Sequence, residues 1–578
     1  MLKTKFLNYK TLMIGFILCC FYAIRYNTFI DYFFNIDELV YLYLYQRAQV
    51  APLPFEGFDT QTSGPISIFI LQLFQKLGLT INLINYRVIL LLISSLFLLN
   101  YSFKSFNNKF SIYTIGCTLG SLLFIYNLDF IAINTEYIII AIVAPMLYIL
   151  FKDSPNKLTT FIYSLLLYIL FLTKFQAVLL VGILTILWVL KFSLLKDRTR
   201  IKVFFIYSSL LLSLLVCSFY SLGILDDFYH NYILRNLEYP KLKQTPNLIN
   251  TLSDNAIIWI KYFSLYILLI LLNSLYNQFK LNQQENQSSI KNIIPFIKTP
   301  EILLRLIFIL ILITLIFQYK IGVNLDKYIP INILKILSGL SLLCIILSSI
   351  CFLKPLKIKE LIDRNNLVKN FKIIVLFAIS VTIYLSIIAA RYNFTHYFVL
   401  CFIPILFWLG FTMEKATKKQ FFFTIIFISL LVGFQKFENK QFEKNFQENI
   451  TKQKILNTKF ENCLSNLHIK NKKESILILG FFEAVPMYYK ASKHFNFSYR
   501  TANTQFITLF YQKGLNNQFF RKEDERLVED IKIGRPHFII DTESILSKIS
   551  RSRTALIIKS KYKIYKKCDK YIIYKCIN

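Results

Sequence analysis

An acidic pair, Asp37-Glu38, lies just beyond the first long apolar segment and is the strongest candidate for chemistry in this chain. Residues 12–30 are almost wholly apolar, so the pair falls where a membrane would meet water. Carboxylates near lipid are costly and usually carry a function or pair with a cation. Partial desolvation raises the pKa of a carboxylate, which suits a general base. We therefore predict general-base chemistry on a lipid-linked substrate, with Asp37 as the base and Glu38 as its neighbour or substitute.

Other ionisable residues stand at the ends of later apolar segments, in the same set of loops. Glu136 begins one segment, Lys174 separates two others, and Arg391 and His396 follow another. A phosphate leaving group gathers negative charge, which fixed cations and N–H donors stabilise. Arginine can grip phosphate with two N–H groups, whereas lysine acts as a point charge. Lys174, Arg391 and His396 are the candidates for this role, and Glu136 is expected to hold a hydroxyl of the substrate or to orient one of the cations.

Each of these residues also has a structural interpretation. The acidic pair could be solvated interfacial charge, or helix-start acids favoured by the helix dipole. Glu136 could likewise be an acid in the first turn of a helix, and Lys174 could extend from the end of a span toward water. Arg391 and His396 could be interface anchors beside two tyrosines.

Two further acidic positions lie in loops on the same side of the predicted membrane. Asp59 could form a turn or contact the substrate, and the sequence leaves both interpretations open. Asp226 and Asp227 are expected to cap a loop helix rather than to take part in catalysis.

The elements that must position these residues are membrane-length apolar windows. The chain has 578 residues, of which 55% are hydrophobic, and this pattern is typical of a polytopic α-helical membrane protein. We expect about thirteen transmembrane helices, while residues 66–79 are too short to span and should lie at the interface. The windows lie near residues 10–30, 86–102, 111–127, 134–151, 158–173, 176–192, 203–221, 255–277, 301–318, 329–353, 373–390, 397–413 and 420–436.

Basic residues set the predicted orientation. The formal net charge is +33, but the lysines and arginines are scattered through alternate loops rather than gathered on one face. This distribution argues against nucleic acid as a partner. It places the N-terminus on the cytoplasmic side of a cell membrane. With an odd number of spans, the tail lies outside, together with the candidate residues. An even number of spans would place the tail on the cytoplasmic side instead.

The chain is expected to divide into a transmembrane domain, residues 1–436, and an extracytoplasmic α/β domain, residues 437–578. Within the first, the catalytic outer loop spans about residues 31–85. In the tail, Ser475–Gly480 and His537–Asp541 are predicted strands and Arg521–Ile533 a helix. Leu556–Ile558 and Tyr571–Tyr574 are predicted as a closing strand pair, and a bridge between Cys568 and Cys576 is left open.

At this point the motifs resemble those of the glycosyltransferase C superfamily, most closely the protein mannosyltransferase and aminoarabinose transferase group (glycosyltransferase family 39-like). The acidic pair with Tyr41, and the loop from Gly57 to Pro65, resemble that family's first outer loop. One departure is Ser63, where many members carry histidine or lysine. The remaining similar motifs are Asn134-Thr135-Glu136, Thr173-Lys174-Phe175-Gln176, Asp226-Asp227-Phe228-Tyr229 and Arg391-Tyr392-Asn393-Phe394-Thr395-His396-Tyr397.

The resemblance implies an inverting glycosyltransferase that takes a sugar from a polyprenyl-phosphate donor. Its acceptor would be an envelope lipid, a polysaccharide or a protein. No cofactor is expected; a divalent cation is compatible with the acidic residues, but we do not expect one to be required. The alternative from another class is a transporter or flippase of lipid-linked sugars. A transporter is expected to carry charged residues along a central pathway between its helices, and often to consist of two related halves. Here the ionisable residues gather on one side of the predicted membrane.

Overall fold

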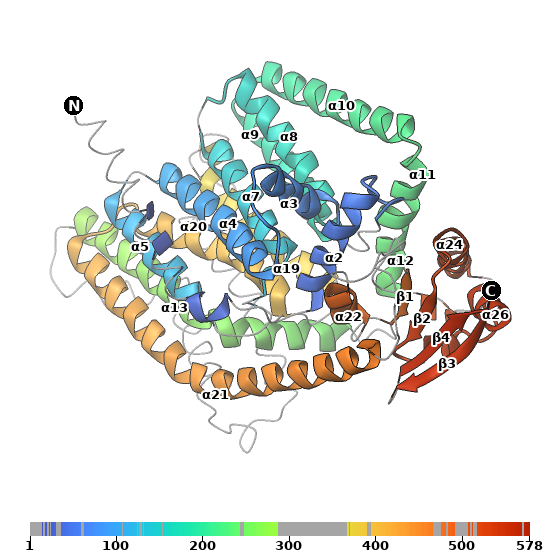
Figure 1. Ribbon diagram of the computed structural model, residues 1–578. Helices are drawn as coiled ribbons and strands as arrows, with labels where there is room; N and C mark the ends of the chain where they lie inside the picture. The colour runs from blue at the N-terminus through green and yellow to red at the C-terminus, as the bar shows by residue number, and fades with distance from the viewer. Residues whose placement is uncertain are drawn as a thin grey trace.

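A computed structural model gives the fold of the chain, which is mainly helical with a small sheet near the C-terminus (Figure 1). The expected windows at 301–318 and 329–353, and most of the window at 10–30, lie outside the described residues. The structure describes residues 36–58, 63–106, 108–123, 132–152, 154–242, 248–286, 370–389, 395–465, 475–480, 484–491, 517–568 and 571–577, with a few isolated residues besides.

In the helical body, each predicted apolar window that falls on described residues forms a helix. In that part of the chain, five helices are long and apolar enough to cross a membrane, while the total of about thirteen spans stays a prediction. The helices of the body are α4 (Leu83–Ser105), α5 (Lys109–Leu123), α7 (Thr135–Phe151), α8 (Lys157–Thr173), α9 (Val178–Leu194), α10 (Arg198–Ser221), α13 (Leu248–Asn286), α19 (Phe371–Ala389), α20 (Phe402–Thr412) and α21 (Lys418–Ser465).

Polar side chains at the start of several helices set where they begin. The Asn82 side chain accepts a hydrogen bond from the amide of Asn85 at the start of α4, and Asn156 does the same for Thr159 at the start of α8. Such caps satisfy amides that have no partner within the helix. The apolar runs then continue each helix until the next polar connection.

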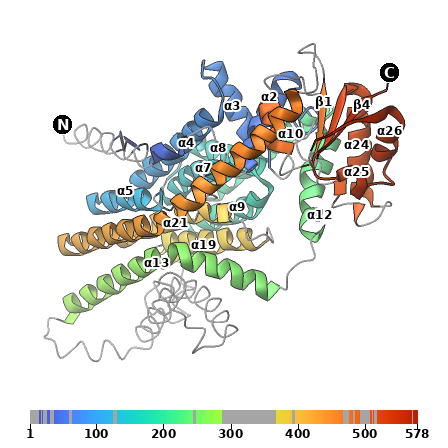
Figure 2. The ribbon, with the colours of Figure 1, turned by 60° about the horizontal axis from the view of Figure 1, so that its bottom comes forward.

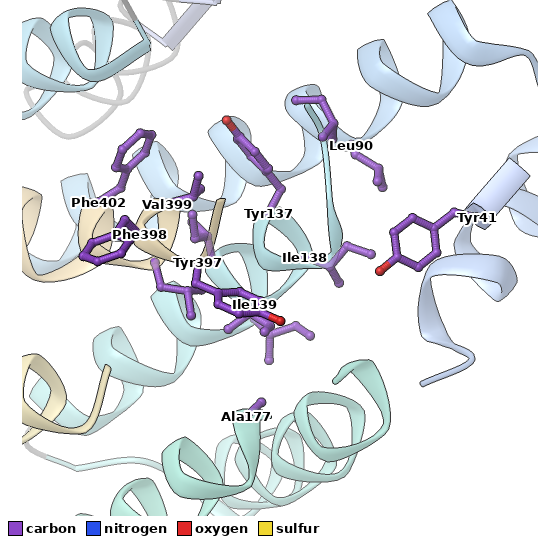
Figure 3. Packing of buried hydrophobic residues seen from close by; sticks show 14 of the residues in the cluster. Tyr41, Leu90, Tyr137, Ile138, Ile139, Ala177, Tyr397, Phe398, Val399 and Phe402 are labelled. Carbon is purple, nitrogen blue, oxygen red and sulfur yellow. The ribbon is translucent and has the colours of Figure 1, made fainter. Parts of the chain in front are cut away.

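Helix α7 lies at the centre of the body, where almost all of its side chains are buried. It packs against α4 and α8, and against the short helix η6 (Thr395–Cys401) that precedes α20. Figure 3 shows Tyr137, Ile138 and Ile139 of α7 near Val399 of η6 and Phe402, the first residue of α20. By contrast, α10 runs along the rim with an apolar surface that is mostly uncovered, as expected for a helix facing lipid.

The segment that follows the first apolar window forms two helices joined by a loop. Helix α2 (Ile36–Val50) carries the acidic pair in its first turn. Helix α3 (Ile66–Lys76) covers most of the interval expected to lie at the interface, and it exposes Phe69 and Leu73. We call the described residues between the two helices, 51–58 and 63–65, the first loop.

Short elements complete the connections between the long helices. The residue Lys174 separates α8 from a single turn, η2 (Phe175–Ala177), that leads into α9. After α10 the chain forms a short turn, a π-helix and a further helix in succession. These are α11 (Leu225–Asp227), η3 (Phe228–Leu234) and α12 (Arg235–Leu242).

The C-terminal part contains a four-stranded mixed sheet in the order β1-β2-β4-β3. Strand β1 (Ile476–Leu479) pairs parallel with β2 (Phe538–Asp541), and β4 (Tyr571–Cys576) pairs antiparallel with both β2 and β3 (Tyr562–Cys568). The predicted strands at 475–480, 537–541 and 571–574 are confirmed. Its helices are α22 (Ala484–Ala491), α24 (Gln518–Gly534), α25 (Ile545–Lys548) and α26 (Arg553–Lys561).

One expectation about this region is wrong, and one open question is answered. Leu556–Ile558 belongs to helix α26, which begins at a Ser552 cap, and the partner of β4 starts only at Tyr562. A short apolar run does not distinguish a strand from a buried helical turn. The bridge left open between Cys568 and Cys576 does not form, since Cys576 has a free thiol. The hairpin register pairs Cys568 with Tyr571 and Cys576 with Tyr562, at opposite ends.

The helical body and the C-terminal sheet are in contact. Helix α21 continues as one helix through the expected boundary at 436–437 and ends at Ser465 (Figure 2). Helix α22 packs against α2, and the rings of Tyr43 and Tyr488 lie 4.9 Å apart. The C-terminal sheet is therefore on the same side of the body as α2 and the acidic pair.

Candidate active site

A buried ion pair joins two of the residues predicted from the sequence. Glu136 lies in the first turn of α7, and Lys174 occupies the extended residue after α8. The Lys174 ammonium donates to Oε1 of Glu136, and the two side chains are 5% and 1% exposed. Burial of two charges is tolerated only when they are paired. The structure therefore brings together residues that lie 38 positions apart in the sequence.

A third predicted residue approaches the same carboxylate from a distant segment. His396 of η6 is buried, and its Nε2 lies 3.9 Å from Oε1 of Glu136. The ring of Tyr397 lies beneath the Lys174 ammonium, with 4.6 Å between the nitrogen and the ring centroid. An ammonium over an aromatic face is held by the quadrupole of the ring. In Figure 3 the Tyr397 ring lies against α7 beside Ile139. We call Glu136, Lys174 and His396 the Glu136 centre.

The first loop reaches this centre through a hydroxyl network. The hydroxyl oxygen of Tyr41 lies 2.8 Å from Oγ of Ser63 and 3.4 Å from Oγ1 of Thr135. Ser63 also forms an isolated antiparallel bridge with Lys174. Helix α2, the end of the first loop, and α7 therefore meet beside the Glu136 centre. Ser63, where the sequence departs from the motif that it otherwise resembles, lies inside this network.

Gly64 is required by the close approach of the first loop to the end of α8. Its amide donates to the Thr173 carbonyl over 3.0 Å. A Cβ atom at Gly64 would lie 1.6 Å from the Leu172 carbonyl oxygen, which is backbone and cannot rotate away. Only glycine allows the loop to pass at this distance.

Asp37 lies on the same face of α2 as Tyr41, and its charge acts on both Tyr41 and Lys174. Burial raises the pKa of Tyr41 to about 12, with a further contribution from the charge of Asp37, so its hydroxyl is protonated at neutral pH. Burial opposes the charge on Lys174, but Glu136, with smaller contributions from Tyr41 and Asp37, outweighs this effect and raises the pKa of Lys174 above its ordinary value. Asp37 is half-buried and lies four residues before Tyr41, on the same helix face.

Glu38 faces a different direction from Asp37. Its Oε1 and Oε2 accept from Nε and Nη2 of Arg87 at 2.8 and 2.7 Å. Oε1 also accepts from the amide of Ile133 at 3.1 Å, and Arg87 donates to the carbonyl of Thr28 at 3.0 Å. This buried network joins α2, α4 and the segment before α7.

Arg87 was not among the predicted site residues. The signal that would have identified it is a single arginine within an otherwise apolar span, a feature that marks a functional or paired residue.

Two predicted residues cannot be placed. Asp59 and Arg391 both lie outside the described residues. Their roles stay predictions.

Several buried polar atoms at the start of α7 remain open to a ligand. Oε2 of Glu136 has no hydrogen-bond partner among the described residues, and the same holds for Oδ1 and Nδ2 of Asn134. Both side chains are 1% exposed. Buried polar atoms without partners cost free energy unless a ligand or water satisfies them. The centre thus offers acceptors and donors beside a fixed cation.

Two carboxylates of the site, Glu136 and Glu38, are each held by a cation. In the described part of the chain, no three His, Cys, Asp or Glu side chains are close enough together to hold a metal ion. The arrangement can hold an anion beside Lys174, bind hydroxyls at the α7 start, and present the Asp37 carboxylate.

No protein-family model and no curated protein sequence matches the chain. Among solved structures it is similar to ArnT from Cupriavidus metallidurans bound to undecaprenyl phosphate, with 10% identity, 98% of each chain covered and a TM-score of 0.39. The apo state of the same protein gives 10% identity, coverage of 98% of this chain and 97% of that chain, and a TM-score of 0.36. At these TM-scores the similarity establishes neither the family nor the activity of this chain.

Proposed function

We propose that the protein is a membrane glycosyltransferase that moves a sugar from a polyprenyl-phosphate donor to a hydroxyl acceptor at the outer face of a cell membrane. The observation that carries the proposal is the convergence of Glu136, Lys174 and His396 with Tyr41 and the acidic first turn of α2. A buried cation, open polar acceptors and a half-buried carboxylate are the groups that such a transfer needs.

The proposed reaction is a direct displacement with inversion. Asp37 takes the proton from the acceptor hydroxyl as its oxygen attacks the anomeric carbon. The bond from that carbon to the donor phosphate oxygen breaks, and its electron pair leaves with the polyprenyl phosphate. The Lys174 ammonium, fixed by Glu136 and by the Tyr397 ring, stabilises the charge that gathers on the phosphate. Arg391 and His396 are proposed to share that role.

The remaining polar groups divide between substrate contact and positioning. Oε2 of Glu136 is an acceptor for a sugar hydroxyl, and the amide of Asn134 offers a donor and an acceptor close by in the chain. Asp59 is proposed as a further substrate contact from the first loop. Glu38 is proposed to position α2 through Arg87, since both of its oxygens are engaged there. The acceptor is a lipid, a polysaccharide or a protein, any of which can present a hydroxyl.

The test is transfer of radiolabelled sugar from polyprenyl-phosphate donors by the purified protein in lipid vesicles. We expect Asp37→Asn to lower turnover by about a hundredfold or more, the usual contribution of a general base. Glu525→Gln is the matched control, because it neutralises an exposed carboxylate on the C-terminal domain. Wild-type transfer by Asp37→Asn would show that Asp37 is not the base. Labelled lipid that crosses the vesicle membrane without a new glycosidic bond would favour the flippase alternative.

A further inference from the structure

The C-terminal domain touches the helical body through a charged face of α24. Nζ of Lys522 lies 3.6 Å from Oδ2 of Asp226, and Nη2 of Arg526 lies 3.7 Å from Oδ1 of Asp227. Arg235, at the start of α12, pairs with Glu523. The expectation that the two aspartates cap a loop helix is wrong, since neither side chain makes a cap hydrogen bond at α11 or η3. Their carboxylates instead meet basic residues nearly 300 positions later in the chain.

One of these residues also binds the backbone of the first loop. Nη2 of Arg526 donates to the Phe55 carbonyl oxygen at 2.7 Å. Nδ2 of Asn231 in η3 donates to the same carbonyl at 3.3 Å and to Oδ1 of Asp227 at 3.0 Å. Arg526 is only 15% exposed, so this charge-assisted bond is shielded from water. A single guanidinium thus bridges the loop helices and the first loop.

Phe55 is itself an unusual residue. Its φ is +68°, a conformation that phenylalanine rarely adopts, and its ring is fully buried. The ring centroid lies 5.3 Å from that of Phe228, 5.7 Å from that of Tyr232 and 6.0 Å from that of Phe219. A strained backbone persists only where surrounding contacts over-determine it. The aromatic cluster and the Arg526 bond supply those contacts.

The rest of the first loop is tied down on its other side. The Phe55 amide donates to the Phe58 carbonyl at 2.9 Å, and the Gly57 amide to the Leu53 carbonyl at 2.8 Å. Nε of Arg47 in α2 donates to the Gly57 carbonyl at 3.0 Å. Residues 55–58 of the first loop are therefore held between α2 and the C-terminal domain, five residues before Ser63 in the sequence.

We infer that Arg526 of the C-terminal domain is a positioning residue for the active site, which acts by holding the Phe55 carbonyl and hence the first loop. The inference rests on the proposed transferase function for its kinetic readout. Ser63 lies on the same loop, where it meets both Tyr41 and Lys174. Because a small displacement of a reacting group costs much of the rate, the C-terminal domain would control turnover without touching the substrate.

The test compares Arg526→Gln with Arg526→Lys and with the control Arg553→Gln, all in the full-length protein. Arg553 lies on the same domain, but its side chain is 71% exposed and pairs with Glu525 outside the contact with the first loop. Hydrogen exchange at the amides of Phe55, Gly57 and Phe58 reports on the loop, since each donates a backbone hydrogen bond. Transfer kinetics with a saturating acceptor report on the site.

We expect Arg526→Gln to speed exchange at these three amides by about tenfold, in line with the loss of one charge-assisted hydrogen bond. Turnover should fall by about the same factor while KM for the lipid donor stays near wild type, since, among the described residues, Arg526 contacts none of those proposed to hold the donor phosphate. Arg526→Lys, which keeps the charge and a donor, should recover most of both effects, and Arg553→Gln should change neither.

Three results would overturn the inference. If exchange and kinetics of Arg526→Gln match those of the Arg553→Gln control, the bond from Arg526 to Phe55 does not position the first loop. Faster exchange throughout the C-terminal domain with a lower melting temperature would reduce Arg526 to a structural residue. A rise in KM alone would mean that the domain serves donor binding. If the wild type transfers no sugar from any donor, the proposed function fails, whereas the exchange comparison still decides whether Arg526 holds the loop.

A double variant that swaps the charges of Asp227 and Arg526 separates the two contacts of Arg526, its ion pair with Asp227 and its hydrogen bond to the Phe55 carbonyl. Asp227→Arg combined with Arg526→Asp restores an ion pair between α11 and α24 but leaves the Phe55 carbonyl without its donor. We expect this double variant to melt as the wild type does and still to show fast loop exchange and low turnover. Full recovery of turnover would contradict the inference, because it would assign the effect to the ion pair.

Discussion

The hydroxyl of Tyr41 lies 2.8 Å from that of Ser63, so helix α2 and the end of the first loop are joined by one hydrogen bond beside the Glu136 centre. Because the pKa of Tyr41 is raised to about 12, this hydroxyl keeps its proton at neutral pH and acts as a donor or acceptor rather than as a base. The general base of the proposed reaction is therefore Asp37 rather than Tyr41.

Tyr41→Phe should lower turnover by about three- to tenfold, which corresponds to the loss of one neutral hydrogen bond. The pH dependence of transfer across the neutral range should keep its wild-type shape, since a tyrosine with so high a pKa does not titrate there. The pH–rate profiles of the two proteins measure both effects. A change in the shape of the profile would give Tyr41 a role in proton transfer that we do not assign to it.

The pair formed by Glu38 and Arg87 should be important for stability. Glu38→Gln leaves the buried guanidinium of Arg87 without its counter-charge, and breaking one partner of such a pair costs about 3–5 kcal/mol. Unfolding in mild detergent, followed by circular dichroism, measures the loss. The double variant Glu38→Leu with Arg87→Leu should be more stable than Glu38→Gln, because it removes both charges. A Glu38→Gln variant that unfolds as the wild type does would contradict this assignment.

Gly64→Ala should disrupt the site strongly while leaving the helices intact. The added methyl group would meet the Leu172 carbonyl, so either the loop or the end of α8 must move. We expect turnover to fall by at least about tenfold, because displacement of Ser63 breaks its bond to Tyr41. Gly182→Ala is the matched control, since a Cβ there meets nothing within 4 Å. Equal activities of the two variants would mean that the close approach is unimportant.

Transfer should continue after treatment with a metal chelator. Two carboxylates of the site are already paired with cations, Glu136 with Lys174 and Glu38 with Arg87. A divalent ion at either carboxylate would have to displace a buried positive charge. The measurement is the transfer rate before and after dialysis against the chelator, with a magnesium add-back as the control. Loss of activity that magnesium restores would show that a cation takes part.

Much of the helical plan could be predicted from the sequence. The apolar windows from 86–102 to 203–221 correspond to α4, α5, α7, α8, α9 and α10. The strand at 475–480 and the helix at 521–533 were also predicted. In the C-terminal domain the prediction failed at Leu556–Ile558, where three apolar residues were compatible with either a strand or a helix.

The candidate site could be predicted only in part. Glu136, Lys174 and His396 were selected as isolated ionisable residues at span ends, and the structure brings them together. The Arg87 partner of Glu38 was missed, as was the contact of Arg526 with the first loop.

The sequence by itself determined which segments are helical and apolar, and which few ionisable residues stand at their ends, because hydrophobic periodicity and charge placement are local properties of the chain. Only the tertiary structure decided which carboxylate meets which cation. Asp37 and Glu38 are adjacent in sequence, yet successive side chains on a helix point about 100° apart. Asp37 therefore shares the helix face of Tyr41, while Glu38 is engaged by Arg87, and the packing of α4 against α2 determines that difference.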